Sequence, residues 1–174
     1  MPAEELMKIS IILLWLIIIL KILVEQIEKR REKKFNLLAG KETGLNINDS
    51  FVISEDISVE NRKILKEQVE KIVLFTSPTC SACSEIYPVL NKINDDLDEI
   101  EIILFSIAQE EISVQDIVEK YGIKIPVIRI NLDELMKYKV KYYPFGYYLS
   151  EANNILSKGI VTNEEEVRLL IEDR

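Results

Sequence analysis

Two cysteines, Cys80 and Cys83, are the residues of this chain whose type and spacing most clearly suggest chemistry, and no other cysteine occurs. They follow an apolar segment, residues 72–76, that is typical of a β-strand, and they come where a helical pattern begins. A thiolate at the start of a helix faces unpaired N–H groups and the positive end of the helix dipole, and both lower its pKa. The placement predicts that Cys80 is the attacking sulfur and that Cys83 is its partner in dithiol–disulfide exchange.

A structural disulfide and half of a metal site are the two other uses of such a pair. A disulfide between residues this close in sequence closes a very short loop, so it removes little conformational entropy from the unfolded chain. A structural zinc site normally has four Cys or His ligands, and the chain has no histidine and no second cysteine pair. The spacing therefore favours redox chemistry over a structural disulfide, and we expect no metal and no organic cofactor.

The composition is that of one folded domain with an appendage. The chain has 174 residues, of which 48% are apolar and 30% charged. Its net charge of -8 argues against a nucleic-acid partner, because binding a polyanion needs a basic surface that neutralises phosphates.

The appendage is an N-terminal apolar segment, residues 6–24. As a helix it would be about 28 Å long, close to the hydrocarbon thickness of a bilayer. Lys8 and Lys21 lie near its ends, where long side chains can reach the membrane interface. A cleaved signal peptide and a buried helix of a soluble protein are alternatives, but no small-residue cleavage site follows directly and apolar residues occupy every face. We expect a membrane anchor over residues 1–24.

The rest of the chain divides into a connecting segment and a folded domain. Residues 25–34 favour a charged helical stalk, and residues 35–49 gather Gly and Asn and predict an irregular linker. We therefore expect a stalk and linker over residues 25–44 and the domain over residues 45–174. Within the domain the patterns predict strands at 51–53, 71–76 and 101–107, an extended segment at 125–130, a hairpin of 145–149 and 155–161, and helices at 59–69, 80–97, 113–121, 132–138 and from 162 or 163 to 172.

This order of elements resembles the thioredoxin fold, an α/β fold in which a central mixed sheet is flanked by helices. Pro88 lies eight residues after Cys80, the spacing of a helix-kinking proline in that family, and Pro144 comes directly before the hairpin. The sequence is similar to the membrane-anchored TlpA and ResA branch. It is most similar to MauD-type methylamine-utilisation accessory proteins, through the N-terminal span, the SPTCSAC stretch at residues 77–83 and the Pro-aromatic hairpin at 144–161.

The resemblance implies an activity and a set of partners. It implies a membrane-tethered thiol–disulfide oxidoreductase that exchanges disulfides with protein partners and is recycled by another redox protein. It also implies a cis Tyr143–Pro144 bond beside the dithiol, so that Tyr143 and Pro144 contact substrate. Domains of this branch work outside the cytoplasmic membrane, whereas the basic residues at 29–34 favour the cytoplasm by the positive-inside rule. We expect the extracytoplasmic location.

Three departures from the family pattern leave a second function open. Thr79 replaces the aromatic residue that often precedes the first cysteine, Leu74 replaces the buried acid of thioredoxins, and Ile86 replaces the acid of the ResA branch. Without these acids and without histidine, proton transfer must use water, backbone groups or another carboxylate. The alternative function is a redox-gated assembly or chaperone factor with little catalytic turnover.

Overall fold

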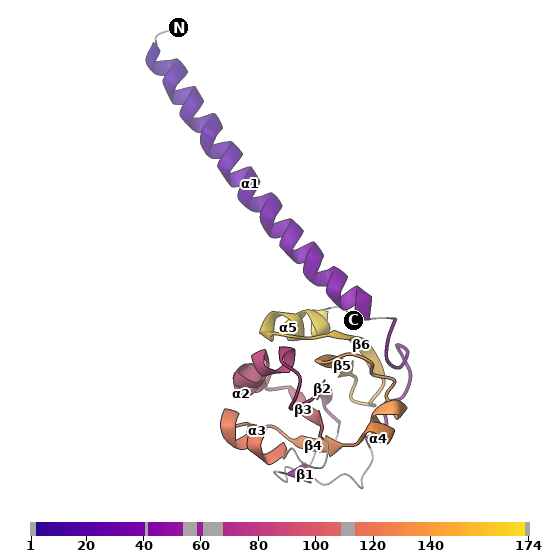
Figure 1. The fold of residues 1–174 in the computed structure, drawn as a ribbon. Helices are drawn as coiled ribbons and strands as arrows, with labels where there is room; N and C mark the ends of the chain where they lie inside the picture. Colours follow the sequence, from indigo (N-terminus) through magenta and orange to yellow (C-terminus); the bar gives the residue numbers. More distant parts are fainter. Residues whose placement is uncertain (1–2, 41, 54–58, 61–67, 109–113, 173–174) are drawn as a thin grey trace. The chain divides into compact units, whose positions relative to one another are not determined.

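The computed structural model describes residues 3–40, 42–53, 59–60, 68–108 and 114–172 (Figure 1). It divides into two compact units, Met1–Phe35 and Asn36–Arg174, which are described separately.

The first unit consists of one helix, α1 (Ala3–Gly40), whose last residues belong to the second unit. Its segment Ser10–Arg30 has a mean hydropathy of 2.3 and is not buried at all, so it is long and apolar enough to cross a membrane. The helix continues through residues 35–40, so the prediction of irregular structure there was wrong. Leu37, Leu38 and Ala39 are good helix formers, and the helix ends only at Gly40. The Gly40 carbonyl then accepts hydrogen bonds from the Thr43 N–H and hydroxyl.

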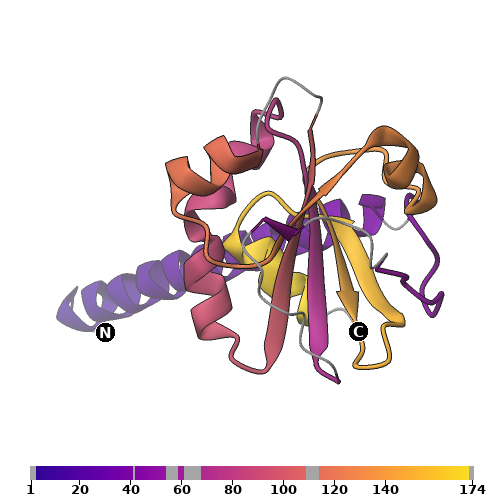
Figure 2. The same ribbon diagram turned by 90° about the horizontal axis from the view of Figure 1, so that it is seen from below.

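The second unit is built on a six-stranded mixed sheet with the order β1-β4-β3-β2-β5-β6. β2, β3 and β4 are parallel, and β1, β5 and β6 each run antiparallel to the strand beside them. Figure 2 shows the strands side by side, with α2 and α3 on one flank and α4 on the other. The bounds are β1 (Val59–Glu60), β2 (Glu70–Thr76), β3 (Ile100–Ile107), β4 (Val127–Ile130), β5 (Phe145–Leu149) and β6 (Ile155–Ile160), with helices α2 (Leu90–Asp96), α3 (Val114–Tyr121), α4 (Leu132–Lys137) and α5 (Glu164–Glu172). The expected central mixed sheet flanked by helices is confirmed.

In the first part of the domain, one expected element was wrong and another is only partly described. Residues 51–53 form no strand; Ser50 alone forms an isolated bridge with Asn154, while the Phe51 ring is buried against other aromatic rings. The predicted helix at 59–69 begins instead with the short strand β1, which pairs with β4, and residues 61–67 lie outside the described part. Phe51 and Ile53 belong to the core on one face of the sheet although residues 51–53 form no strand.

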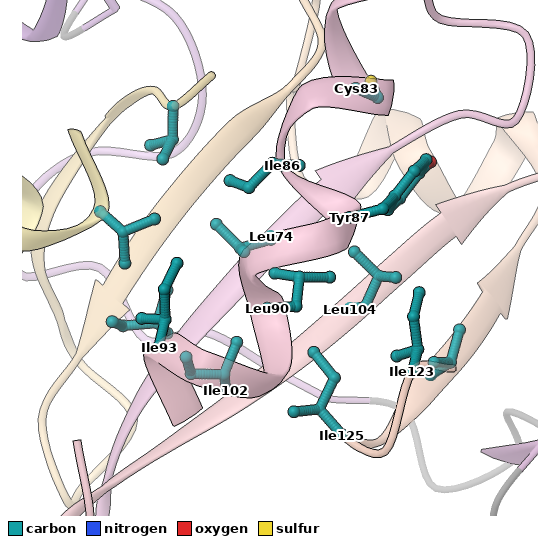
Figure 3. Packing of buried hydrophobic residues seen from close by; sticks show 14 of the residues in the cluster. Leu74, Cys83, Ile86, Tyr87, Leu90, Ile93, Ile102, Leu104, Ile123 and Ile125 are labelled. Carbon is teal, nitrogen blue, oxygen red and sulfur yellow. The ribbon is translucent and has the colours of Figure 1, made fainter. Parts of the chain in front are cut away.

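Each face of the sheet carries its own hydrophobic core, which explains why β2 and β3 show no polar alternation. Ile72, Leu74, Ile102 and Leu104 face α2, α3, α5 and the segment that contains Cys83 (Figure 3). The alternate residues of β2 and β3 face α4 and the entry segment around Phe51. The fold therefore holds the cysteine segment against one face, at the carboxyl ends of the parallel strands.

The helix expected at 80–97 is broken into three pieces. Two short 3-10 turns, η1 (Ala82–Glu85) and η2 (Tyr87–Val89), precede α2. Pro88 has no N–H to donate to the carbonyl of Ser84, so an α-helical ladder cannot pass through this point. The later helices and the hairpin agree with the prediction to within two residues, apart from Ser113, which lies outside the described residues.

Candidate active site

The cysteine pair lies directly after β2, on a turn that the local sequence favours. The Ser77 carbonyl accepts the Cys80 N–H at 3.0 Å, and Pro78 occupies the second position of this turn, where its fixed φ fits. Cys80 and Cys83 form a disulfide with their Cα atoms 5.3 Å apart. Cys80 is half-buried and Cys83 is completely buried, so the two sulfurs differ in their access to another molecule.

The group that the fold places at the Cys80 sulfur is one backbone N–H. The Cys83 N–H lies 3.2 Å from Cys80 Sγ, and it also donates to the Cys80 carbonyl at 3.1 Å. The long helix that was expected to supply a dipole at Cys80 is absent, because the α-helix begins only at Leu90. The Cys83 N–H is therefore the group that this structure offers to a thiolate at Cys80 once the disulfide is reduced.

A cavity of about 330 Å³ adjoins Cys80 and lies between the cysteine segment and α3. Its lining includes the apolar side chains of Tyr87, Ile117 and Tyr121, with the Tyr87 and Tyr121 ring centroids 5.2 Å apart. Asp116 and Lys120 of α3 also line it, and the Lys120 ammonium lies 5.0 Å from the centroid of the Tyr121 ring. The sequence did not identify these α3 residues. The available signal was that α3 follows β3, whose carboxyl end lies beside the carboxyl end of β2, where the cysteines are.

Tyr143 and Pro144 lie at the same edge of the sheet as Cys80, because Phe145 pairs with Phe75 near the end of β2. Their peptide bond is cis, as the resemblance implied. Tyr143 is half-buried and, like Cys80, packs against the hydrophobic cluster that contains Cys83. Burial raises the pKa of Tyr143 above its ordinary value, so its hydroxyl is neutral at physiological pH.

The positions where related proteins carry acids are apolar and completely buried. Leu74 on β2 and Ile86 between the two 3-10 turns both belong to the cluster around Cys83. In the part of the chain that the structure describes, no group of three or more His, Cys, Asp or Glu residues is arranged to hold a metal ion. The polar groups that line the cavity at Cys80 are therefore backbone groups, hydroxyls and the Asp116 and Lys120 side chains.

Comparison with known proteins assigns the family. The sequence model of the family described as Thioredoxin matches residues 29–155. The methylamine utilization protein MauD of Methylophilus methylotrophus is 25% identical over 101 residues, which cover 58% of this chain and 47% of MauD, so the chain spans about half the length of this curated relative.

Solved structures show the same fold. StoA from Bacillus subtilis matches with a TM-score of 0.52 and 20% identity, covering 61% of this chain and 84% of StoA. A secreted disulfide oxidoreductase of Mycobacterium tuberculosis matches with a TM-score of 0.51 and 15% identity, covering 62% of this chain and 84% of that protein. A putative protein disulfide isomerase of Bacteroides thetaiotaomicron matches with a TM-score of 0.59 and 16% identity, covering 75% of this chain and 89% of that protein. The family match spans well over half of the chain and includes both cysteines, so the chain belongs to the thioredoxin family.

Proposed function

We propose that this protein is a membrane-tethered thiol–disulfide oxidoreductase that exchanges disulfides with protein partners through Cys80 and Cys83. The observation that carries the proposal is the unequal burial of the two sulfurs. Cys80 is half-buried beside a cavity, whereas Cys83 is completely buried behind it. A sulfur that meets a disulfide on another protein must be accessible, so Cys80 is the attacking residue and Cys83 the resolving one.

The reaction consists of two exchanges at sulfur. In the reductive direction the Cys80 thiolate attacks one sulfur of a substrate disulfide, and the other substrate sulfur leaves as a thiolate. Cys83 then attacks the Cys80 sulfur of this mixed disulfide, and the remaining substrate sulfur leaves. Two electrons pass from the dithiol to the substrate, and the protein is left with the Cys80–Cys83 disulfide. A second redox protein must reduce this disulfide again; oxidation of a substrate dithiol is the same sequence in reverse.

Two regions beside Cys80 are proposed to hold the substrate polypeptide. Tyr143 and Pro144 provide the first, because they lie at the same sheet edge and an extended segment can pair with the Tyr143 backbone in β fashion. The cavity against α3 provides the second, because Tyr121 and Ile117 offer an apolar surface to a side chain that flanks the substrate cysteine.

We further propose that residues 1–24 anchor the protein in the cytoplasmic membrane and that residues 45–174 form a catalytic domain outside the cytoplasm. Residues 25–44 are the stalk and linker that connect the anchor to this domain. The apolar segment Ser10–Arg30 supports the anchor by its length and hydropathy. The family resemblance and the use of cysteine support the location. Both cysteines of the chain belong to one redox-active pair, which suits an oxidising compartment where further thiols would mispair.

The test is reduction of a protein disulfide, for example in insulin, by the detergent-solubilised full chain with a dithiol as electron donor. We expect turnover with the natural sequence and none with Cys80→Ala. The buried apolar residues Leu74 and Ile86 favour the alternative, a redox-gated assembly or chaperone factor, because no acid stands there to move protons. Absence of turnover with several dithiol donors, together with redox-dependent retention of a partner, would exclude the oxidoreductase and support the assembly factor.

A further inference from the structure

Two buried hydroxyl groups at the carboxyl ends of β2 and β3 have no hydrogen-bond partner among the described residues. Thr76 at the end of β2 and Ser106 near the end of β3 are both completely inaccessible to solvent. Among the described residues, neither Thr76 Oγ1 nor Ser106 Oγ has a hydrogen-bond partner. Buried polar groups in proteins nearly always have one, so two neighbouring exceptions require an explanation.

The sheet register places both hydroxyls on the face that carries the cysteines. Thr76 and Ser106 are direct neighbours in the parallel pairing of β2 with β3. Side chains alternate along a strand, so Thr76 points to the same face as Leu74, and Ser106 to the same face as Leu104. Figure 3 shows Leu74 and Leu104 against the helical segment, whose Cys83 end lies toward the carboxyl ends of the strands. The hydroxyls form the next row in that direction, toward Cys83.

Tyr87 connects this buried row with the cavity at Cys80. Its hydroxyl donates to the Ser77 carbonyl at 3.3 Å, and its side chain lines the cavity. Burial raises the pKa of Tyr87, and the nearby Thr76 hydroxyl opposes that rise, although the two groups do not reach hydrogen-bond geometry. Tyr87 therefore lies near the Thr76 hydroxyl and also borders the cavity beside Cys80.

The Cys83 sulfur gives these hydroxyls a charged acceptor only when the disulfide is reduced. In the disulfide Cys83 Sγ carries no charge and no proton. When the disulfide opens, the same sulfur is a completely buried thiol that must ionise before it can attack, and Leu74 and Ile86 offer it no polar contact. A buried thiolate is costly unless donors hydrogen-bond to it.

We propose that Thr76 and Ser106 are positioning residues for Cys83: in the reduced protein their hydroxyls donate hydrogen bonds to the Cys83 thiolate and so promote the second exchange. The inference rests on the proposed function and assigns the polar groups that work where the family acids are missing. In that step Cys83 releases its proton to water in the cavity, and its thiolate attacks the Cys80 sulfur. The bond between Cys80 and the substrate sulfur breaks, and the substrate leaves as a thiolate that takes a proton from solvent.

The experiment separates the two exchanges with the aromatic disulfide dithiobis(nitrobenzoate) as substrate. The reduced full chain releases one coloured thiolate when Cys80 attacks and a second when Cys83 resolves the mixed disulfide, so stopped-flow absorbance gives a rate for each step. Thr76→Val removes the hydroxyl at nearly constant shape, and we expect the second release to become about tenfold slower while the first is unchanged. Ser106→Ala should act in the same direction, and Thr76→Ser should restore the second rate.

The pH dependence of the second release provides a readout that a purely structural role would not change. Its midpoint should move to higher pH in Thr76→Val and return in Thr76→Ser. The other titratable or charged side chains around this end of the segment are Glu85 and Tyr87 on the segment itself, Asp116, Lys120 and Tyr121 on α3, and Tyr143 before β5, and they stay the same in all these variants. Ser157→Ala, which removes a buried hydroxyl on β6 that does have a partner in Leu170, controls for general loss of packing.

Three outcomes overturn one idea or the other. A second release within twofold of the natural rate in both Thr76→Val and Ser106→Ala, or an equal slowing of both releases, excludes the positioning role while leaving the oxidoreductase intact. A natural protein that gives two releases but never reduces insulin contradicts the proposed function, while the two rates still test Thr76 and Ser106. A natural protein that gives no second release contradicts both.

Discussion

The proposed roles of Cys80 and Cys83 differ because the surroundings of the two residues differ. Cys80 lies at the end of a hydrogen-bonded turn beside a cavity, with the Cys83 N–H at its sulfur. Cys83 is packed among Leu74, Ile86 and Tyr87 and does not reach solvent. In the proposed mechanism, the same chemical group therefore acts as the nucleophile toward other proteins at one position and as the internal resolving group at the other.

Replacing each cysteine separately should give different products. Cys80→Ala should abolish both exchange and trapping, because the remaining thiol is buried. Cys83→Ala should allow one attack and then stall, so that a partner stays covalently attached to Cys80. Mass spectrometry of non-reduced complexes would identify that partner. Faster alkylation of Cys83 than of Cys80 in the reduced protein would contradict these roles.

The cavity residue Tyr121 should matter for binding a protein substrate and little for chemistry at sulfur. Tyr121→Ala removes half of the ring pair that lines the cavity, and we expect the KM for a protein disulfide to rise about fivefold to tenfold with little change in kcat. Met136→Ala on α4 is the matched control, because Met136 is 75% exposed and does not line this cavity. An equal effect of both substitutions would show that the cavity is not a substrate site.

The sequence was sufficient to predict which residues form the cysteine pair and the cis peptide bond, and insufficient to predict what surrounds them. Cys80, Cys83 and the cis bond at Pro144 follow from residue type, spacing and family pattern. The lining of the cavity by Tyr121 and the missing partners of Thr76 are properties of the packed structure. A threonine at the end of a strand is ordinary in sequence, and only the register of β2 with β3 shows that it lies beside Ser106.

The helices and strands were predicted accurately where a local sequence signal marks the start of a helix or the turn of a hairpin. The start of α5 is such a case, because the Glu166 N–H donates to Asn163 Oδ1 and the Glu166 carboxylate accepts from the Thr162 N–H. The hairpin turn is another, with Asn153 at a positive φ of 58°. β1 was missed because a strand of two residues is too short to show alternating hydrophobicity, and its pairing with β4 exists only in the folded sheet.

The end of α1 offers a test of how closely one element approaches another within the second unit. A Cβ atom on Gly40 would lie 2.7 Å from the Cα of Gly159 and 2.8 Å from the Ile160 nitrogen, both of which are backbone atoms. Gly40→Ala should therefore force the end of α1 away from β6 and reduce the free energy of unfolding by about 1–3 kcal/mol. Denaturant unfolding of the full chain in detergent measures this loss.

The control for this substitution is Gly122→Ala. Gly122 has a positive φ of 59° but no atom within 4 Å of its would-be Cβ, so the change there measures backbone strain alone. An unchanged free energy of unfolding in Gly40→Ala would show that the contact with β6 is not tight.

Two features of the molecule predict opposite orientations in the membrane. The segment after the apolar span contains Lys29, Arg30, Arg31, Lys33 and Lys34, and the positive-inside rule would keep this side in the cytoplasm. The second unit carries one cysteine pair in the disulfide form, and such pairs find substrates and persist in an oxidising compartment. Glu25, Glu28 and Glu32 lie among the basic residues, but acids contribute little to that rule.

The location of the second unit should follow its chemistry, with the catalytic domain outside the cytoplasm. After mild reduction of intact cells, a membrane-impermeant maleimide should label Cys80, because the half-buried sulfur is accessible from the cavity side. The chain with both Cys80→Ala and Cys83→Ala has no thiol and gives the background, and a membrane-permeant maleimide gives the maximum signal. Labelling that appears only after the membrane is broken would place the domain in the cytoplasm. In that case the basic segment, and not the chemistry of the cysteine pair, determines the orientation, and the physiological substrate must be a cytoplasmic disulfide.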